Sequence, residues 1–321
     1  MTTTRPMPQP SVAKTDDREK VFEAFRRWGY LQASLDPLGH MAPAECAELE
    51  VGGKSADAAR KVYCGSVGVE FMHMLQPERR QWVQQRMEAT PEASQPEAVL
   101  QRLLRSELFE QVIQARYLGT KRFSLEGLCG LIPFLDSMLD AAIAHGAVEA
   151  VIGMSHRGRL NVMLHIVGRG ADELFAGFED VDPRSVLGSG DVKYHMGATG
   201  DFVTPRGKIH LHLVSNPSHL EAVDPVVLGR TRAKQTRMGE DSRQKYVPIV
   251  LHGDAAFAGQ GIWAETLNLS GLPGYEVGGA LHIINNNLIG FTTTPKELHA
   301  TRFASDLAKR LPIPIFHVNA E

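Results

Sequence analysis

The chain has 321 residues, of which 43% are hydrophobic and 22% are charged, and its formal net charge is -3. These values are typical of a soluble globular protein with one large or two modest domains. They give no global basic field that would recruit nucleic acid or an anionic membrane. Three cysteines without a CxxC pair disfavour a disulfide framework or a zinc knuckle, and no apolar run approaches the roughly 18 residues of a membrane span.

Residues 1–17 predict a disordered tail. They contain Pro6, Pro8 and Pro10, which interrupt any amphipathic helix, and they lack the apolar core of a secretory signal. The cysteine pattern fits a reducing compartment. We therefore expect a cytoplasmic protein if the source is a bacterium, and a mitochondrial matrix protein if it is a eukaryote.

Residues 18–118 predict a helical region. Apolar residues recur there at three- and four-residue spacings, most clearly in QPERRQWVQQRMEA and PEAVLQRLLRSELFEQVIQARYL. Breakers at 36–39 and 51–53 separate the early helices. We interpret the apolar stripes of these helices as core positions.

Residues 119–321 predict an α/β domain in which a parallel sheet has helices on both faces. Short β-branched runs alternate with helical stretches, the pattern of such a sheet. The expected strands are 147–155, 208–216, 246–254, 279–287 and 312–320, and the expected helices are 125–144, 217–235 and 261–270. Ligands of these sheets bind beyond the carboxyl ends of the strands. Because the last strand has no helix after it, we expect the domain to be truncated at its carboxyl end.

Polar residues follow two of the expected strands. GDAAFAGQG begins at the end of the strand 246–254, and INNNLIGFTT spans the end of 279–287. Asp254 and Asn287 are 33 positions apart, which suits a strand–helix–strand unit with both residues at one sheet edge. A carboxylate oxygen, an amide oxygen and a backbone carbonyl form an oxygen set suited to Mg²⁺. The helix after Gly259 would direct its amino end at phosphates bound there.

Three competing motifs fail on context. The segment 259–264 matches a dinucleotide fingerprint, but five residues separate it from the strand, and the next strand ends in asparagines rather than an acid. The GKS of 53–55 lacks the first glycine of a P-loop. Ser155 misses the spacing of a nucleophile elbow by one position.

The paired strings GDAAFAGQG and INNNLIGFTT resemble the thiamine diphosphate motif of the 2-oxoglutarate dehydrogenase family. Further strings resemble that family along nearly the whole chain after the tail: FRRWGYLQASLDPLG, VYCGSVGVEFMHM, KRFSLEGLCGLIPFLD, GMSHRGRLNV, GSGDVKYHMG and NPSHLEAVDPVV. The resemblance implies a thiamine diphosphate-binding fold in the second part of the chain.

The same resemblance implies the site residues. Asp254, the Asn287 side chain and the Ile289 backbone carbonyl would hold Mg²⁺, and Ala255 stands where other thiamine enzymes have glycine. Arg157 would contact the cofactor diphosphate. His156 and His195 would be active-site histidines, which can bind a carboxylate and move protons near neutral pH.

Residues outside these motifs have simpler interpretations. His210 and His212 share one strand face, and we expect His210 to face the active site. Ser218 and Glu221 follow a helix-start signal, and we interpret them as helix caps. Thr199 is a candidate hydroxyl for the substrate.

The implied activity is oxidative decarboxylation of 2-oxoglutarate in the tricarboxylic acid cycle, with thiamine diphosphate and Mg²⁺ as cofactors. The succinyl group would pass to the lipoyl domain of a dihydrolipoyl succinyltransferase, and the full-length enzyme would be a homodimer. In this family a glutamate of a later domain activates the cofactor, and no part of this chain resembles that domain. We therefore expect an amino-terminal fragment that is inactive alone.

Three alternatives stay open at this stage. A sister dehydrogenase would act on 2-oxoadipate or another 2-oxo acid. A split-subunit enzyme would make this a complete α-type chain. A non-catalytic module would bind Mg²⁺ and diphosphate without turnover.

Overall fold

A computed structural model describes residues 18–36, 38–39, 41–90, 95–179, 195–239 and 242–320. The tail expected at 1–17 lies outside this range. The chain divides into two compact units, Met1–Glu92 with Lys309–Asn319, and Ala93–Ala308 with Ala320–Glu321. We describe each unit by itself.

The smaller unit packs helices around a two-stranded sheet. Its elements are α1 (Arg18–Trp28), η1 (Gly29–Gln32), η2 (Ala47–Leu49), α2 (Lys54–Tyr63), β1 (Val67–Glu70), α3 (Pro77–Glu88) and β7 (Ile315–Val318). Phe22, Phe25 and Tyr63 are buried in its core. These helices confirm the helical region that the apolar periodicity predicted. The strand β1 was not predicted, because four residues are too few to show a strand pattern.

Strand β7 corrects one expectation. We expected 312–320 to form the last strand of the parallel sheet, but β7 pairs antiparallel with β1, with Glu70 opposite Ile315. Glu70 also accepts a hydrogen bond from His317, with 2.8 Å between Oε1 and Nε2. A β-branched run predicts a strand but not its partner, because the same run satisfies either sheet.

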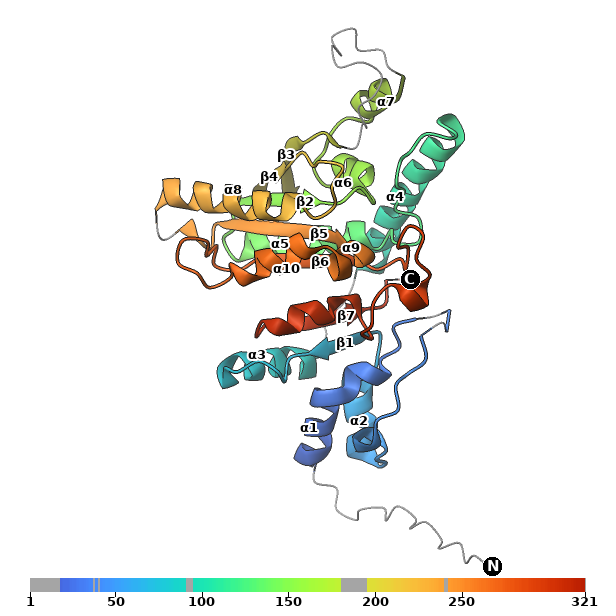
Figure 1. Cartoon of the computed structure of the whole chain (residues 1–321), viewed down its shortest axis with the longest axis vertical. Coiled ribbons are helices and arrows are strands. Elements are labelled where there is room, and N and C mark those ends of the chain that lie inside the picture. The colour runs from blue at the N-terminus through green and yellow to red at the C-terminus, as the bar shows by residue number, and fades with distance from the viewer. Residues whose placement is uncertain are drawn as a thin grey trace, which may run out of the picture. The chain divides into compact units, whose positions relative to one another are not determined.

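The larger unit contains a five-stranded sheet in the order β3-β4-β2-β5-β6 (Figure 1). The strands are β2 (Glu149–Met154), β3 (Ala198–Thr204), β4 (Gly207–Leu213), β5 (Tyr246–Gly253) and β6 (Leu281–Asn285). The four strands β4, β2, β5 and β6 are parallel, and the edge strand β3 is antiparallel to β4. This confirms the α/β class, with an antiparallel edge strand that the sequence pattern had not indicated.

Helices precede, connect and follow these strands along the chain. They are α4 (Pro96–Arg116), α5 (Leu131–Ala144), α6 (Arg159–His165), α7 (Ala171–Glu179), α8 (Val223–Met238), α9 (Asp254–Gly259) and α10 (Gly261–Asn268), with short 3₁₀ turns η6 (Pro295–Glu297) and η7 (Ala304–Arg310). The three expected helices are present as α5, α8 and α10, and the first two begin six residues later than expected. Within the described part of the chain, no helix is both long and apolar enough to cross a membrane.

The sheet buries apolar side chains on both faces. Alternate strand residues point to opposite faces, so Ala150 and Ile152 of β2 pack with the cluster that includes residues of α4, α5 and α6. Val151 of β2 packs on the other face with Val223 and Val227 of α8. Both faces are therefore covered, which explains why the strand sequences are almost continuously hydrophobic.

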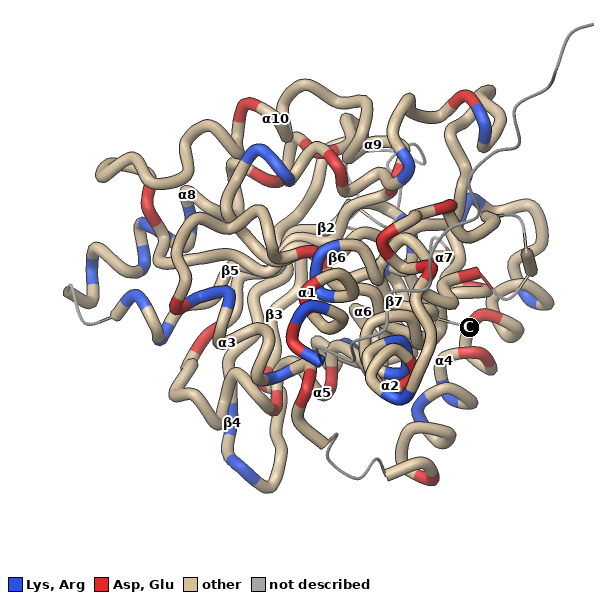
Figure 2. The backbone as a smooth tube through the Cα atoms, turned by 90° about the horizontal axis from the view of Figure 1, so that it is seen from below, with Lys and Arg blue, Asp and Glu red and all other residues tan. Residues whose placement is uncertain are grey.

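Helix α4 belongs to the larger unit, so the units divide near residue 92 rather than at the expected 118/119. Arg102 of α4 forms a two-pronged ion pair with Asp136 of α5, with N–O distances of 2.5 and 2.9 Å. The Ser106 hydroxyl donates a hydrogen bond to Oδ1 of the buried Asn161 of α6. Both acidic and basic residues lie along α4 (Figure 2). Its periodicity was recognisable from the sequence, but contacts with α5 and α6 place it in the larger unit.

The order of the strands creates a switch point between β2 and β5. After β2 the chain forms β3 and β4 on one side of β2, and later β5 on the other side. The backbone N–H of Ser155, just after β2, donates to Leu251 of β5 at 3.1 Å. Since ligands of open α/β sheets bind where the strand order reverses, the residues after β2 and β5 are the first place to look for a site.

Two glycine substitutions test this packing. A Cβ added at Gly200 of β3 would lie 1.9 Å from the backbone oxygen of Val167, whereas one at Gly229 of α8 would meet nothing within 4 Å. We expect Gly200→Ala to lower the free energy of unfolding by about 1–3 kcal/mol or more. Gly229→Ala should raise it by about 1 kcal/mol, because alanine favours the helix. Urea unfolding curves measure both, and equal effects would contradict the packing.

Candidate active site

Two histidines meet beyond the end of β2. His156 follows this strand, is 8% exposed, and places its Nε2 3.2 Å from Nε2 of His195. The Phe123 ring lies 5.2 Å from the His156 ring. Burial and the neighbouring His195 lower the pKa of His156 to about 4. The structure thus brings together the two predicted histidines, with His156 neutral at pH 7. Residues 188–194 of the motif GSGDVKYHMG lie outside the described range.

The segment after β4 holds this histidine pair. The backbone N–H of Asn216 donates to the His195 carbonyl at 3.1 Å, and Ser218 Oγ lies 3.4 Å from His195 Nε2. His156 hydrogen-bonds the Pro217 backbone. The two imidazoles are therefore held by one short stretch of chain. Ser218, expected as a helix cap, contacts His195 instead.

Arg157 places a cation beside the end of β5. Its Nη1 donates to the Ser124 carbonyl at 2.9 Å. Burial lowers the pKa of the Arg157 guanidinium, and the charges of Asp254 and Glu110 oppose that shift. A half-buried guanidinium close to a buried carboxylate is suited to binding an anion at this edge.

Asp254 and Asn287 are adjacent, as their positions after β5 and β6 predicted. Asp254 is 1% exposed, and its carboxylate accepts hydrogen bonds from the backbone amides of Ala255, Asn287 and Leu288. Burial raises the pKa of Asp254, and those amides oppose the shift. Leu288 has a left-handed backbone, with φ of 56°, and the Ile289 N–H donates to Asn287 Oδ1 at 3.1 Å. The tight turn 287–289 thus wraps the carboxylate.

One oxygen of this carboxylate bears on cation binding. Asp254 Oδ2 is buried and makes no hydrogen bond to any described residue. A buried carboxylate oxygen without a partner is costly. A divalent cation would satisfy it, and the amide oxygen of Asn287 lies on the adjoining turn. The residues present therefore fit a Mg²⁺ ion.

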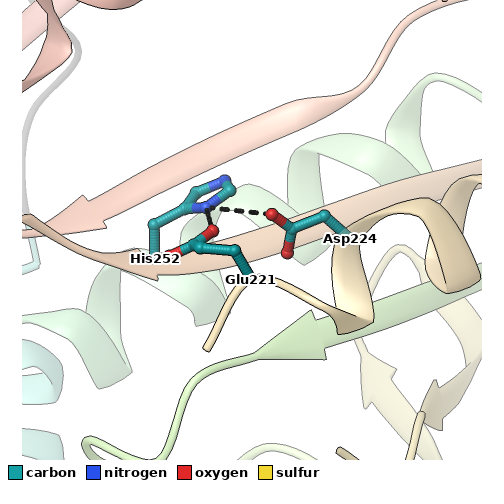
Figure 3. A group of neighbouring side chains, drawn as sticks. All are labelled: Glu221, Asp224 and His252. Carbon is teal, nitrogen blue, oxygen red and sulfur yellow. Dashed lines mark hydrogen bonds and ion pairs between the residues drawn. The ribbon is translucent and has the colours of Figure 1, made fainter. Parts of the chain in front are cut away.

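A buried cluster on the α8 side of β5 was not predicted. Glu221, Asp224 and His252 are each nearly or fully buried, and Glu221 Oε2 and His252 Nδ1 are in direct hydrogen-bond contact (Figure 3). Asp224 Oδ2 lies 3.7 Å from the same nitrogen. The expected capping role of Glu221 was wrong, because α8 has Ala222 at its N-cap without a side-chain bond. Local capping rules cannot detect a partner 31 residues away.

Arg159 was also not predicted from the sequence as a site residue. It is fully buried and donates to the carbonyl oxygens of Met154, Met196 and Val214. These carbonyls lie at the end of β2, beside His195 and just after β4. Burial lowers the pKa of Arg159 to about 10. Its guanidinium therefore ties together the backbone segments that carry the histidine pair.

Two minor candidates lie elsewhere. His210 pairs with Glu149, the first residue of β2, and its exposed ring contacts Asp201 at 2.9 Å. It therefore lies away from the carboxyl ends of the strands, against expectation. Thr199 and His212 face each other across β3 and β4 and line a hollow of about 360 Å³ with Arg230.

Comparison with known proteins identifies the class. The family described as Dehydrogenase E1 component matches residues 101–321. The chain therefore belongs to this family, whose match covers the entire sheet of the larger unit and the edge that carries Arg157, Asp254 and Asn287.

Individual relatives are similar along nearly the whole chain. A "Multifunctional 2-oxoglutarate metabolism enzyme" of Mycolicibacterium vanbaalenii is 48% identical over 95% of this chain and 28% of its own length. A "2-oxoglutarate dehydrogenase E1 component" of Brucella anthropi is 43% identical over 94% of this chain, as is that of Brucella canis. The chain spans 34% of the length of each Brucella protein.

The protonation state of His156 is directly measurable. Because its folded pKa of about 4 lies below the ordinary 6.5, the ring contributes stability above pH 6.5 that is lost as pH falls towards 4. With ¹⁵N-labelled histidine, we expect the His156 ring to stay neutral from pH 7.5 to about 5 and to titrate near 6.5 in urea. His156→Asn assigns the resonance, and protonation near pH 6.5 in the folded protein would contradict this geometry.

Proposed function

We propose that this chain supplies the Mg²⁺–diphosphate side of a thiamine diphosphate-dependent 2-oxoglutarate dehydrogenase. The observation that carries the proposal is the buried Asp254 carboxylate, wrapped by the turn 287–289 and keeping one unsatisfied oxygen. This arrangement lies at the switch point of the sheet, where α/β proteins bind cofactors. The names of the relatives support the substrate.

Each cofactor-binding residue has a distinct task. Asp254, the Asn287 side chain and the Ile289 carbonyl hold Mg²⁺, and Ala255 donates its backbone amide to the Asp254 carboxylate. Arg157 neutralises charge on the diphosphate. When bound, thiamine diphosphate supplies the electron sink that decarboxylation of a 2-oxo acid requires.

The histidine pair acts on the substrate side. His156 is neutral at pH 7, so one ring nitrogen donates a hydrogen bond and the other accepts one. A pair of imidazoles 3.2 Å apart can share a proton between them and pass it to a group that gains charge. Their role is to orient a carboxylate of the dianionic substrate and to move a proton at Nε2.

The remaining parts of the reaction belong to the longer proteins that this chain matches. The acyl acceptor is a lipoyl domain of a dihydrolipoyl succinyltransferase, the full-length enzyme is a homodimer, and the compartment is the bacterial cytoplasm or the mitochondrial matrix. A sister activity on 2-oxoadipate uses the same edge, and comparison of the two 2-oxo acids as substrates of the full-length enzyme separates them.

Removal of the central carboxylate tests the cation site. We expect Asp254→Ala to weaken Mg²⁺-dependent binding of thiamine diphosphate by at least about 100-fold, since it removes a ligand rather than an outer partner. Titration calorimetry with both cofactors measures this. Asp201→Ala, which removes an exposed carboxylate paired with Lys208, is the matched control. Unchanged binding by Asp254→Ala would refute the assignment.

The isolated chain should be inactive. We expect weak binding of thiamine diphosphate and no release of CO₂ from 2-oxoglutarate, because the glutamate that activates the cofactor in this family is not among the matching motifs. An assay with ¹⁴C-labelled 2-oxoglutarate is sensitive enough to decide. Turnover by the purified 321-residue chain would show that it contains its own activating group.

A further inference from the structure

Glu221 has an unusual backbone for its residue type. Its φ is +66°, in the left-handed region, and it is not a glycine. That conformation costs on the order of 1 kcal/mol or more and persists only where surrounding contacts enforce it. Glu221 is 3% exposed, and its carboxylate contacts Nδ1 of the fully buried His252. The strained backbone therefore delivers a carboxylate to a buried histidine.

His252 is fixed on every side. Its other ring nitrogen, Nε2, lies 3.1 Å from Nδ1 of His282 on the neighbouring strand. The rings of Trp263 and Phe257 lie 4.7 and 5.0 Å from the His252 ring. His252 is also two residues before Asp254. Any contact that orients His252 thus orients the last residues of β5.

The segment that carries Glu221 also contacts the histidine pair His156 and His195. Its beginning, Asn216 to Ser218, contacts His195 and His156 through the bonds described above. Six residues of chain therefore connect the histidine pair to the strand end that carries Asp254. A shift of Glu221 would therefore move both the histidine pair and the end of β5.

We propose that Glu221 is a positioning residue, which through His252 fixes the carboxyl end of β5 and thereby sets the place of Asp254. The inference rests on the proposed cofactor site. It adds a residue that does not touch the cation but determines how well the cation is bound, as outer partners of metal ligands commonly do.

A metal ion within the cluster is the competing interpretation. The ligand atoms of Glu221, Asp224 and His252 all lie within 4.8 Å of one another. Two ligands of one tetrahedral ion at 2.0–2.1 Å are roughly 3.3 Å apart. Glu221 and His252 are instead in hydrogen-bond contact, which leaves no room for an ion between them. A proton joins this pair.

Asp224 completes the charge balance of the cluster. Burial and the hydrogen bond with Glu221 raise the pKa of Asp224 to about 9, so it keeps its proton at pH 7. Burial also raises the pKa of Glu221, to about 7. At most one carboxylate of the cluster is therefore ionised beside His252 at pH 7.

Two substitutions at Glu221 test the inference. Glu221→Gln keeps the shape but removes the charge, and Glu221→Gly removes the side chain while relieving the left-handed strain. With thiamine diphosphate in excess, we expect the Mg²⁺ affinity to fall about 10-fold in the first and about 100-fold in the second, within the range for outer partners. Without cofactors, emission of Trp263, which lies against His252, should shift in both variants.

Glu70→Gln is the matched control. It alters another buried carboxylate that contacts a histidine, His317, in the smaller unit. We expect it to change the midpoint of thermal unfolding without changing the Mg²⁺ affinity. A purely structural role for Glu221 would give that same pattern in the folded Glu221→Gly protein and would overturn the inference.

The remaining outcomes separate this inference from the proposed function. If the unaltered chain binds no Mg²⁺ with thiamine diphosphate, the proposed function fails and the inference fails with it. If it binds and both Glu221 variants bind equally well, only the inference fails. One equivalent of tightly held metal in the purified chain, measured by mass spectrometry and lost in Glu221→Gln, would replace the positioning role by a metal site.

Discussion

The parallel alignment of β4, β2, β5 and β6 is the constraint on which the rest of the larger unit depends. Parallel pairing brings the carboxyl ends of these strands to one edge, and the reversal of order at β2 and β5 leaves that edge accessible. His156 and Asp254 follow the two strands that meet at the reversal. The candidate site is thus a consequence of strand order, and the connecting loops refine it.

Burial of charge is the second theme at this edge. Asp254, Glu221 and Arg159 are all nearly or fully removed from solvent, which is costly for an ionised group unless polar partners replace water. Each group is compensated differently. Backbone amides surround Asp254, a histidine meets Glu221, and three carbonyl oxygens receive the Arg159 guanidinium. Each of the three groups also keeps one buried polar atom that makes no hydrogen bond to any described residue, and that atom of Asp254, Oδ2, lies where the cation is proposed.

The sequence predicted more of the sheet than of its surroundings. The strands around Gly153, Leu251 and Ile283 were recognisable because residues buried on both faces form short apolar runs. The run around Phe316 looked the same, yet it pairs with β1 in the smaller unit. The hydrophobic pattern predicts that a segment forms a buried strand. It does not predict which strand it pairs with, because that depends on the path of the chain in three dimensions. For the same reason, the helical periodicity of α4 grouped it with the helices of 18–118, whereas it belongs to the larger unit.

The sequence by itself determined the α/β class, the polar residues that end the strands, and the pairing of Asp254 with Asn287, because these depend on local periodicity and spacing. Only the tertiary structure decided that His156 meets His195 and that Glu221 reaches His252 rather than capping α8. Those contacts join residues 39 and 31 positions apart. Such contacts depend on where the tertiary structure places His195 and the segment after β4, and no local pattern in the sequence encodes that placement.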